Sequence, residues 1–321
     1  MSPRVVHEAP ATGRQWDDAW RSSPWATWFE SREWSETWCA CSSGQLCPDA
    51  RLVTFSDGVE AVLAVSRQTL GRGRGVRTIA SPQGTYGGWL SGDRLTGAHA
   101  RLLADRLLDL TPDLYWRLNP YDPLAAALRL PTRPDTTLAV DLRDGFEAAV
   151  RRWSRGHRSS AHKAQRAGVA VRRAVTEDDW RAYFDVYLAS RERWGVDPYA
   201  GYGWPLFAEL LRRASPQVEL WLAGVDETIV AGALCFSTSW HTVYWHGGAL
   251  AEYFALRPVT WLMHEMMRDA GERGVAWFDL NPSGGLSGVR EFKERFGARV
   301  LSCPVVERRS SRTRLLHRRR R

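Results

Sequence analysis

The sequence predicts an α/β (α+β) protein of two tandem domains, each a mixed, twisted β-sheet flanked by helices. Two observations lead to this prediction. The 321 residues suffice for two domains of ordinary size. The order strand, helix, hairpin, helix, strand also occurs twice along the chain. We expect a first domain at 1–145, a second at 146–307 and a disordered arginine-rich tail at 308–321.

The first half opens with helices rich in tryptophan and continues with a hairpin. Six of the 17 tryptophans fall within residues 16–38, at spacings that favour packing between helices over a platform for stacked bases. Residues 51–66 alternate around Asp57-Gly58, a strong hairpin turn. The expected elements that follow are a loop at 71–75, a strand at 76–80, an exposed turn-rich segment at 81–89, a helix at 98–109 and a strand at 114–118.

The second half repeats this order. Thr176 is a helix N-cap with Asp179 three residues on, and apolar positions then recur at helical spacing until Gly195. The expected elements that follow are strands at 218–223, 229–237 and 242–247, an amphipathic helix at 258–273 and a buried strand at 275–280.

Composition limits the class of protein. With 44% hydrophobic and 25% charged residues the chain is typical of globular proteins. No apolar run approaches the roughly 20 residues of a membrane span, and the N-terminal residues lack the apolar core of a signal peptide. We therefore expect a cytoplasmic protein. Five cysteines argue against a disulfide framework, and Cys39, Cys41 and Cys47 are expected as reduced thiols rather than as a metal site.

The positive charge is unevenly distributed. Residues 308–321 hold eight arginines and no acid, which equals the formal net charge of +8. The remainder of the chain is therefore neutral. We expect such a run of arginines to contact RNA, to contact anionic lipid, or to be solvated without a dedicated partner. Contact with anionic lipid would place the protein peripherally at the inner face of a membrane.

A second basic segment lies at 149–175, which contains no acid. A helix of one charge sign repels itself unless it faces anions, so phosphates are the natural partner; a solvated helix near acidic loops is the alternative. The residues we expect to bind phosphate here are Arg155, Arg158, Lys163 and Arg166.

Lysine is rare in this chain. Of the 44 lysines and arginines, only Lys163 and Lys293 are lysines. Each is therefore a candidate for a role that needs a compact, titratable ammonium. Lys293 follows Phe292 on a short helix behind a glycine-rich turn, and that turn follows the strand end Asp279-Leu-Asn281. Strand ends beside such loops hold ligands in α/β folds.

These segments resemble the Fem-type (FemABX) aminoacyltransferases and their relatives in the GNAT acyltransferase superfamily. The resemblance is carried by Arg158 to Val169, Tyr244-Trp-His-Gly-Gly248, Asp279 and Phe292 to Gly297. It is clear over 146–305 and weaker over 50–145, where Ser81 to Gly88 is similar to the family's first-domain loop.

The resemblance implies two GNAT-like domains and transfer of an acyl group to an amine. In Fem-type members the donor is aminoacyl-tRNA and the acceptor is a peptidoglycan precursor. Lys293 would then stabilise the charge of the tetrahedral intermediate beside Phe292, and Asp279 or the substrate would accept the amine proton. The further residues we predict are Tyr86, Tyr244, His246, Asn281 and Arg257 for substrate, and Arg295 together with the basic helix for tRNA phosphates.

Two features depart from better-known relatives. No heptad repeat predicts an inserted coiled-coil arm. The segment 252–258 lacks the glycines with which acetyl-CoA-dependent relatives hold a pyrophosphate. We therefore expect aminoacyl-tRNA as co-substrate, no cofactor and no metal. The acceptor is a cell-wall precursor or a peptide-like metabolite. The alternatives are an acyl-CoA-dependent N-acyltransferase in polysaccharide or lipid assembly, and a non-catalytic RNA- or membrane-binding module.

Overall fold

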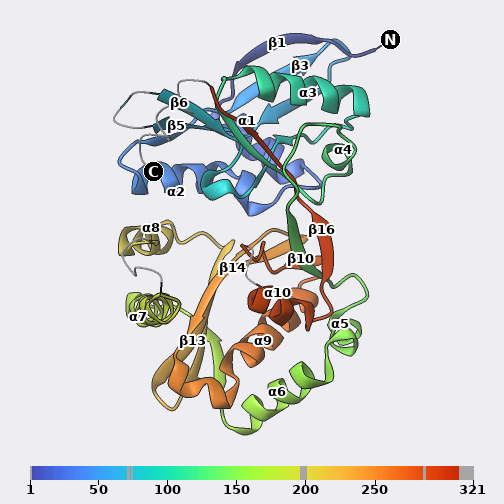
Figure 1. Ribbon diagram of the computed structural model, residues 1–321. Coiled ribbons are helices and arrows are strands. Elements are labelled where there is room, and N and C mark those ends of the chain that lie inside the picture. The colour runs from blue at the N-terminus through green and yellow to red at the C-terminus, as the bar shows by residue number, and fades with distance from the viewer. Residues whose placement is uncertain (1, 71–72, 74, 196–200, 285–286, 311–321) are drawn as a thin grey trace. The chain divides into compact units, whose positions relative to one another are not determined.

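The computed structural model describes residues 2–70, 73, 75–195, 201–284 and 287–310. The chain forms two compact units, one of residues 1–136 and 302–321 and one of residues 137–301 (Figure 1). The sequence analysis placed the division near 145 and assigned 302–307 to the second domain. The difference arises from two strands. The strand at 136–141 pairs with the strand at 277–279 in the second unit, and the strand at 305–308 pairs with the strand at 114–118 in the first.

The first unit contains two sheets, of strand order β1-β3-β4-β8 and β17-β9-β6-β5-β2, with β7 also paired to β9. Its strands are β1 Val5–Pro10, β2 Leu46–Pro48, β3 Arg51–Phe55, β4 Glu60–Leu63, β5 Ser66–Leu70, β6 Gly75–Ile79, β7 Tyr86–Gly87, β8 Trp89–Leu90, β9 Leu114–Leu118 and β17 Val305–Arg308. Its helices are α1 Gly13–Ser22, α2 Arg32–Cys41, α3 Gly97–Asp109 and α4 Pro123–Ala126, with short 3₁₀ turns at Trp28–Glu30 and Pro82–Gly84.

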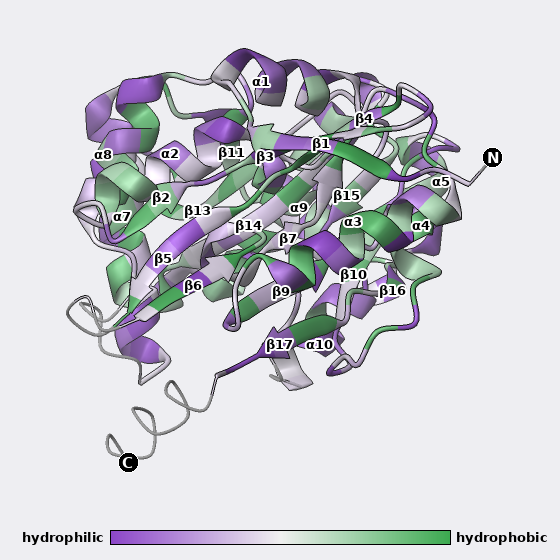
Figure 2. Cartoon of the chain, turned by 90° about the horizontal axis from the view of Figure 1, so that it is seen from above, coloured by the Kyte–Doolittle hydropathy of each residue, from purple (hydrophilic) through white to green (hydrophobic). Residues whose placement is uncertain are grey.

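Strand β4 shows how the sequence builds this unit. Ala61 and Leu63 belong to the core under α3, whereas Val62 belongs to the core under α1. The strand is therefore buried on both faces, with successive side chains pointing to opposite sides. Hydrophobic and hydrophilic bands alternate along α3 (Figure 2), as expected of a helix with one buried face. The predicted hairpin is confirmed, because β3 and β4 pair antiparallel around Asp57-Gly58.

The second unit has one mixed sheet of strand order β11-β12-β13-β14-β15-β10-β16. Its strands are β10 Thr136–Asp141, β11 Ala170–Arg173, β12 Val218–Val225, β13 Thr228–Ser237, β14 His241–Ala249, β15 Trp277–Asp279 and β16 Arg299–Ser302. Its helices are α5 Phe146–Arg152, α6 Arg155–Arg166, α7 Glu177–Arg193, α8 Trp204–Arg213, α9 Pro258–Glu272 and α10 Ser287–Glu294, with a 3₁₀ turn η4 at Ala251–Leu256.

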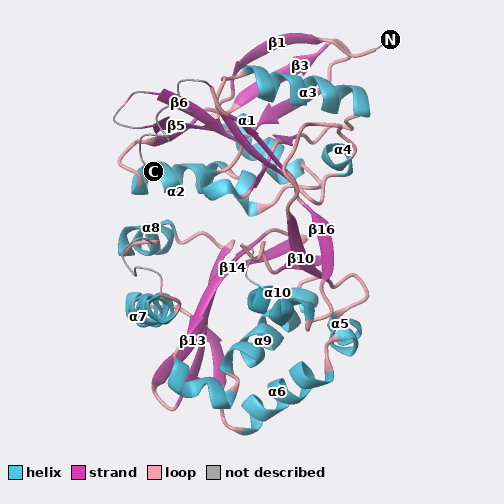
Figure 3. Cartoon of the chain, in the orientation of Figure 1, coloured by secondary structure: helices cyan, strands magenta, loops and turns pink. Residues whose placement is uncertain are grey.

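Helices cover both faces of this sheet. Helix α9 lies on one side of β13 and β14, and α7 and α8 lie on the other (Figure 3). Helix α7 begins at the predicted cap: Thr176 accepts from the backbone N–H of Asp179, and the Asp179 side chain accepts from that of Thr176. This capping box satisfies two N–H groups that the first turn leaves open.

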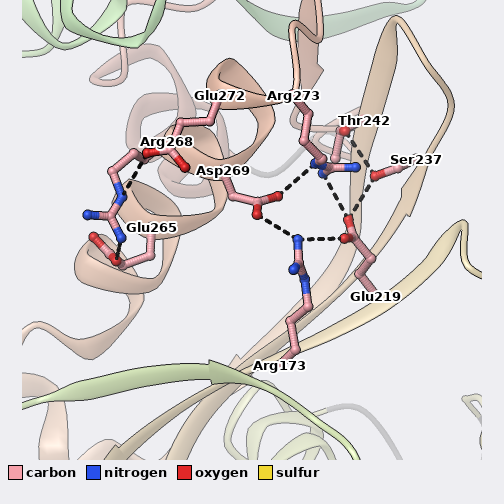
Figure 4. Close-up of polar contacts among 9 residues, drawn as sticks. All are labelled: Arg173, Glu219, Ser237, Thr242, Glu265, Arg268, Asp269, Glu272 and Arg273. Atoms are coloured by element: carbon pink, nitrogen blue, oxygen red, sulfur yellow. Dashed lines mark hydrogen bonds and ion pairs between the residues drawn. The ribbon is translucent and has the colours of Figure 1, made fainter.

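A network of charged side chains connects α9 to strands β11, β12 and β13. Asp269 on α9 accepts from Arg173 at 2.6 Å and from Arg273 at 2.8 Å. Both arginines also contact Glu219 on β12, at 2.9 and 3.1 Å, and Ser237 donates to the same carboxylate (Figure 4). Since α9 connects β14 to β15, this network helps to fix the two strands that frame the candidate site.

Arg308, which the sequence assigned to the tail, closes β17, and Ser310 donates to Asp113. Residues 311–321 and part of the loop at 71–75 lie outside the described residues. None of the described helices is both long enough and apolar enough to cross a membrane.

Candidate functional site

The candidate site lies where the parallel strands β14 and β15 separate. They pair only between His241–Val243 and Trp277–Asp279. Beyond that point β15 ends, while β14 continues to Ala249. On its other edge β14 pairs Tyr244 with Cys235 and His246 with Leu234, which leaves Trp245 as an extra residue in a β-bulge. Bulges and diverging strand ends are both common at active sites.

Asp279 ends β15 and is completely buried. Its carboxylate accepts from the Thr137 hydroxyl and from the Asn281 backbone N–H, each at 2.7 Å. The Nε2 atom of His241, also fully buried, lies 3.6 Å from the other carboxylate oxygen. This geometry fits a group that positions the loop after β15 better than one that collects a proton from an incoming amine.

Asn281 bridges the opening between the strands. Its backbone has a φ of 63°, a left-handed conformation that asparagine tolerates better than most residues. From there its side-chain amide donates to the carbonyl oxygen of Trp245 at 3.2 Å. The amide therefore ties the end of β15 to the bulge of β14.

Lys293 reaches this loop from α10. The side chain is only 6% exposed, and Nζ donates to the carbonyl oxygens of Asn281 at 2.8 Å and Pro282 at 3.2 Å. Burial lowers the pKa of Lys293 to about 8, although the nearby Asp279 carboxylate opposes that fall. An ammonium carries three N–H donors, and the described residues supply acceptors for two. The third is available to an oxygen atom that gains charge during a reaction.

Phe292 contacts α6 rather than the loop. Its ring lies 5.1 Å from those of His157 and Phe296. Burial lowers the pKa of His157, and the charges of Arg295 and Arg257 lower it further. Arg257 is exposed at the N-terminus of α9. These contacts bring the start of α6, the start of α9 and helix α10 to one region of the second unit.

Tyr244 and His246 lie on opposite faces of the sheet, although the sequence analysis grouped them as substrate contacts. Tyr244 packs against the core on the α9 side. The Nδ1 atom of His246 lies 2.7 Å from the hydroxyl of Tyr183 on α7, and its Nε2 atom is buried without a hydrogen-bond partner. Burial lowers the pKa of His246 to about 3. The bulge at Trp245 shifts the alternation that would otherwise have placed both side chains on one face.

The predicted phosphate contacts divide into two groups. Arg155, Lys163 and Arg166 are exposed on α6, and no described residue forms an ion pair with them. Arg158 instead donates to the carbonyl oxygens of Arg151 and Trp153 at the end of α5. Arg295, which follows the last residue of α10, pairs with Glu291 on that helix. The first group is therefore the one free to meet an anion.

Tyr86 lies in the first unit and is fully buried. Its ring packs 5.8 Å from Phe29 and 6.4 Å from Tyr121. The prediction that residues 81–89 form an exposed segment is wrong, because Ser81 and Trp89 are buried as well. Tyr86 thus belongs to the core of its unit.

The sequence analysis missed Thr137 and His241, which hold Asp279. Only the pairing of β15 with β10 and β14 brings them together, and no local motif marks either residue.

Within the described ranges no group of histidine, cysteine or acidic side chains has the geometry to hold a metal ion. Cys39 and Cys47 have their sulfur atoms 3.8 Å apart.

Comparisons with known proteins give one family match. Residues 146–294 match a family model described as an acetyltransferase (GNAT) domain. No curated protein matches the chain.

Several solved structures share the fold. FemX has a TM-score of 0.71 at 12% identity, over 93% of this chain and 96% of its own. The C-terminal domain of a putative lysylphosphatidylglycerol synthetase from Agrobacterium fabrum has a TM-score of 0.60 at 12% identity, over 96% of each chain. L-PGS from Bacillus licheniformis has a TM-score of 0.58 at 12% identity, over 99% of this chain and 98% of its own. At these identities the likeness shows the fold alone.

Proposed function

We propose that this chain is an acyltransferase that transfers an aminoacyl group from aminoacyl-tRNA to an amine. The match of residues 146–294 to a GNAT acetyltransferase domain supports the transfer of an acyl group. The acceptor is the amine of a peptidoglycan precursor or of a peptide-like metabolite. The observation that supports the proposal most strongly is the buried ammonium of Lys293 at the end of β15, where the strands separate.

The chemistry requires little beyond position and charge. The amine nitrogen attacks the ester carbonyl carbon, and the carbonyl oxygen becomes an oxyanion. Lys293 donates its third N–H to that oxygen, and a preorganised donor of this kind acts most strongly where water is excluded. The ester C–O bond then breaks. The ribose oxygen of the tRNA leaves with the proton that the amine gives up, and an amide forms.

The state of Lys293 suits this role. With a pKa of about 8, the side chain is mostly an ammonium at pH 7. Asp279 assists indirectly, because its bond to the Asn281 N–H orients the carbonyl groups that Lys293 contacts. We assign the amine proton to the leaving ribose oxygen because no carboxylate of the loop is free to accept it.

The exposed cations of α6 support a tRNA donor. Arg155, Lys163 and Arg166 present charge without a described acidic partner, as contacts to a phosphate backbone require. An acyl-CoA donor has less support. A 3₁₀ turn without glycine lies ahead of α9, and the first residue of the helix, Pro258, has no N–H to offer a pyrophosphate.

A binding experiment separates the two donors. We expect charged tRNA to bind with an affinity that falls steeply with salt, and the triple variant R155A/K163A/R166A to bind more weakly with a shallower salt dependence. Arg181→Ala, at an exposed position of α7 where the arginine pairs with Glu177, is the control. Equal tRNA binding by both variants, or binding of acyl-CoA without binding of tRNA, would contradict the proposal.

The identity of the acceptor can be tested by comparing two candidate substrates. The solved relatives include a putative lysylphosphatidylglycerol synthetase, so a lipid acceptor is the second candidate. Transfer assays with an amine-bearing cell-wall precursor and with phosphatidylglycerol vesicles distinguish the two.

A further inference from the structure

The two units carry the same tripeptide at the same place in their folds. Leu118-Asn119-Pro120 ends β9, and Leu280-Asn281-Pro282 follows β15. In each unit the residue two positions before the asparagine pairs with a parallel neighbouring strand. Arg117 pairs with Tyr86 on β7, and Asp279 pairs with Val243 on β14. The end of β9 is therefore the counterpart, in the first unit, of the candidate site in the second.

The charge at this counterpart is reversed. Asn281 donates to the carbonyl oxygen of Trp245, and its own carbonyl oxygen accepts from the Lys293 ammonium. Asn119 donates instead to the Trp25 carbonyl oxygen at 2.8 Å, and its amide also lies 3.2 Å from both carboxylate oxygens of Glu30. Glu30 is 2% exposed. Burial raises its pKa to about 7, and the charge of Asp122 contributes to that rise.

A cavity of about 280 Å³ lies beside these groups, within the first unit. Most of its wall is apolar, and Trp25, which is 38% exposed, stands where the cavity meets solvent. A narrower hollow next to Glu30 and Asn119 shares Trp89 and Asp122 with it. The wall of the cavity includes Trp25, Trp89, Arg94, Leu95, Asp122 and Leu124.

Asp122 is the polar group best placed to meet a ligand. It is 5% exposed, and burial raises its pKa. A carboxylate has about four acceptor positions. The backbone N–H groups of Leu124 and Ala125 and the indole of Trp89 occupy three of them. Among the contacts of the described residues, one position remains for a further donor.

We propose that this cavity binds a small ligand with a primary ammonium group on an apolar or aromatic body. The ammonium lies against Asp122, and the body packs between Trp25, Trp89 and Leu124. Two facts favour a cation over an anion. The wall of the cavity carries two carboxyl groups, of Asp93 and Asp122, against the single guanidinium of Arg94, and the carboxyl group of Glu30 lies beyond it in the narrow hollow. Indole rings also attract cations through their faces.

The main competing explanation is that these acids only support local structure. Asp122 caps α4, and Glu30 closes the turn at Trp28–Glu30. That explanation predicts no ligand, so a binding measurement separates it from the proposal.

The test uses the full-length protein and isothermal titration calorimetry. The probe is 2-phenylethylamine; 2-phenylethanol serves as an uncharged analogue of the same shape and 3-phenylpropanoate as an anion. We expect the amine to bind at least tenfold more tightly than the alcohol and the anion not to bind. Asp122→Asn keeps a side chain that can cap α4 and should weaken amine binding at least tenfold. The exposed Asp178→Asn on α7 should bind as the parent does.

Trp25→Leu gives a second measurement should the Asp122 variant fail to fold, since Trp25 is at the surface. This substitution should weaken the binding of 2-phenylethylamine by several-fold. Equal binding of amine and alcohol, or parental binding by both the Asp122 and the Trp25 variants, overturns the proposal. Lys293→Met should still bind the probe, because the proposal does not depend on the transfer reaction. Absence of transfer activity in the parent protein, with amine binding retained, would therefore count against the proposed function only.

Discussion

Replacing Lys293 by methionine removes the ammonium while keeping a side chain of similar length. The fall in the pKa from 10.5 to about 8 means that the buried ammonium is disfavoured by about 3 kcal/mol relative to water. The substitution relieves that penalty. It also removes two hydrogen bonds from a charged donor, each worth about 1.5–3 kcal/mol. We therefore expect the free energy of unfolding to fall by no more than about 3 kcal/mol.

The effect on transfer should be much larger. Loss of one oxyanion donor lowers kcat by about 10²–10³, and KM should change little because the third N–H acts on the transition state. The assay is single-turnover transfer of a labelled aminoacyl group to an amine, with urea unfolding in parallel. Arg290→Met, exposed on the same helix and paired with Glu294, is the control.

The pH dependence follows from the direction of the pKa shift. Since the folded pKa lies below the unfolded value, both states are protonated below pH 8. Between pH 8 and 10.5 the unfolded state binds more protons, so the contribution of Lys293 to stability improves as the pH rises. Activity should behave in the opposite way and fall above pH 8 as the ammonium is lost. Wild-type kcat in Lys293→Met, or a large loss of stability with unchanged kcat, would refute the reasoning.

Three further predictions concern stability. Asp279→Ala leaves the Thr137 hydroxyl and the Asn281 N–H without their acceptor; we expect a loss of about 2–4 kcal/mol in urea unfolding, and a loss under 1 kcal/mol would contradict the network. Glu30 has a folded pKa above its unfolded value, so its contribution should decline by up to about 3 kcal/mol as the pH rises from 4.5 to 7. Glu30→Gln should remove that part of the slope, and identical pH profiles would count against it. Asp269→Ala breaks two partly exposed ion pairs; it should lower stability by about 1 kcal/mol, and no measurable effect would show that the network is dispensable.

Local signals in the sequence predicted the fold well. Asp57-Gly58 marks its hairpin, and Thr176 with Asp179 marks the start of a long helix, because turn and cap preferences act over a few residues. The position of Lys293 beside the end of β15 was also predicted, since the strand, the turn and the helix follow one another directly.

Contacts between residues that are distant in the sequence could not be predicted from such local signals. His241 and Asp279 meet only because their strands are parallel neighbours, and one bulged residue, Trp245, turns Tyr244 and His246 to opposite faces of the sheet. One signal of this longer-range arrangement is nevertheless present in the sequence. The repeated Leu-Asn-Pro, around Asn119 and Asn281, marks the equivalent strand ends of the two units.

The most direct test of the proposed reaction is transfer of a labelled amino acid from tRNA. The purified chain is incubated with tRNA charged with the labelled amino acid and with an amine-bearing cell-wall precursor, and products are identified by mass spectrometry. The proposal predicts that label leaves the tRNA and appears in an alkali-stable amide on the amine. Label that stays on the tRNA, while an acyl-CoA donor supports amide formation in the same assay, would contradict it.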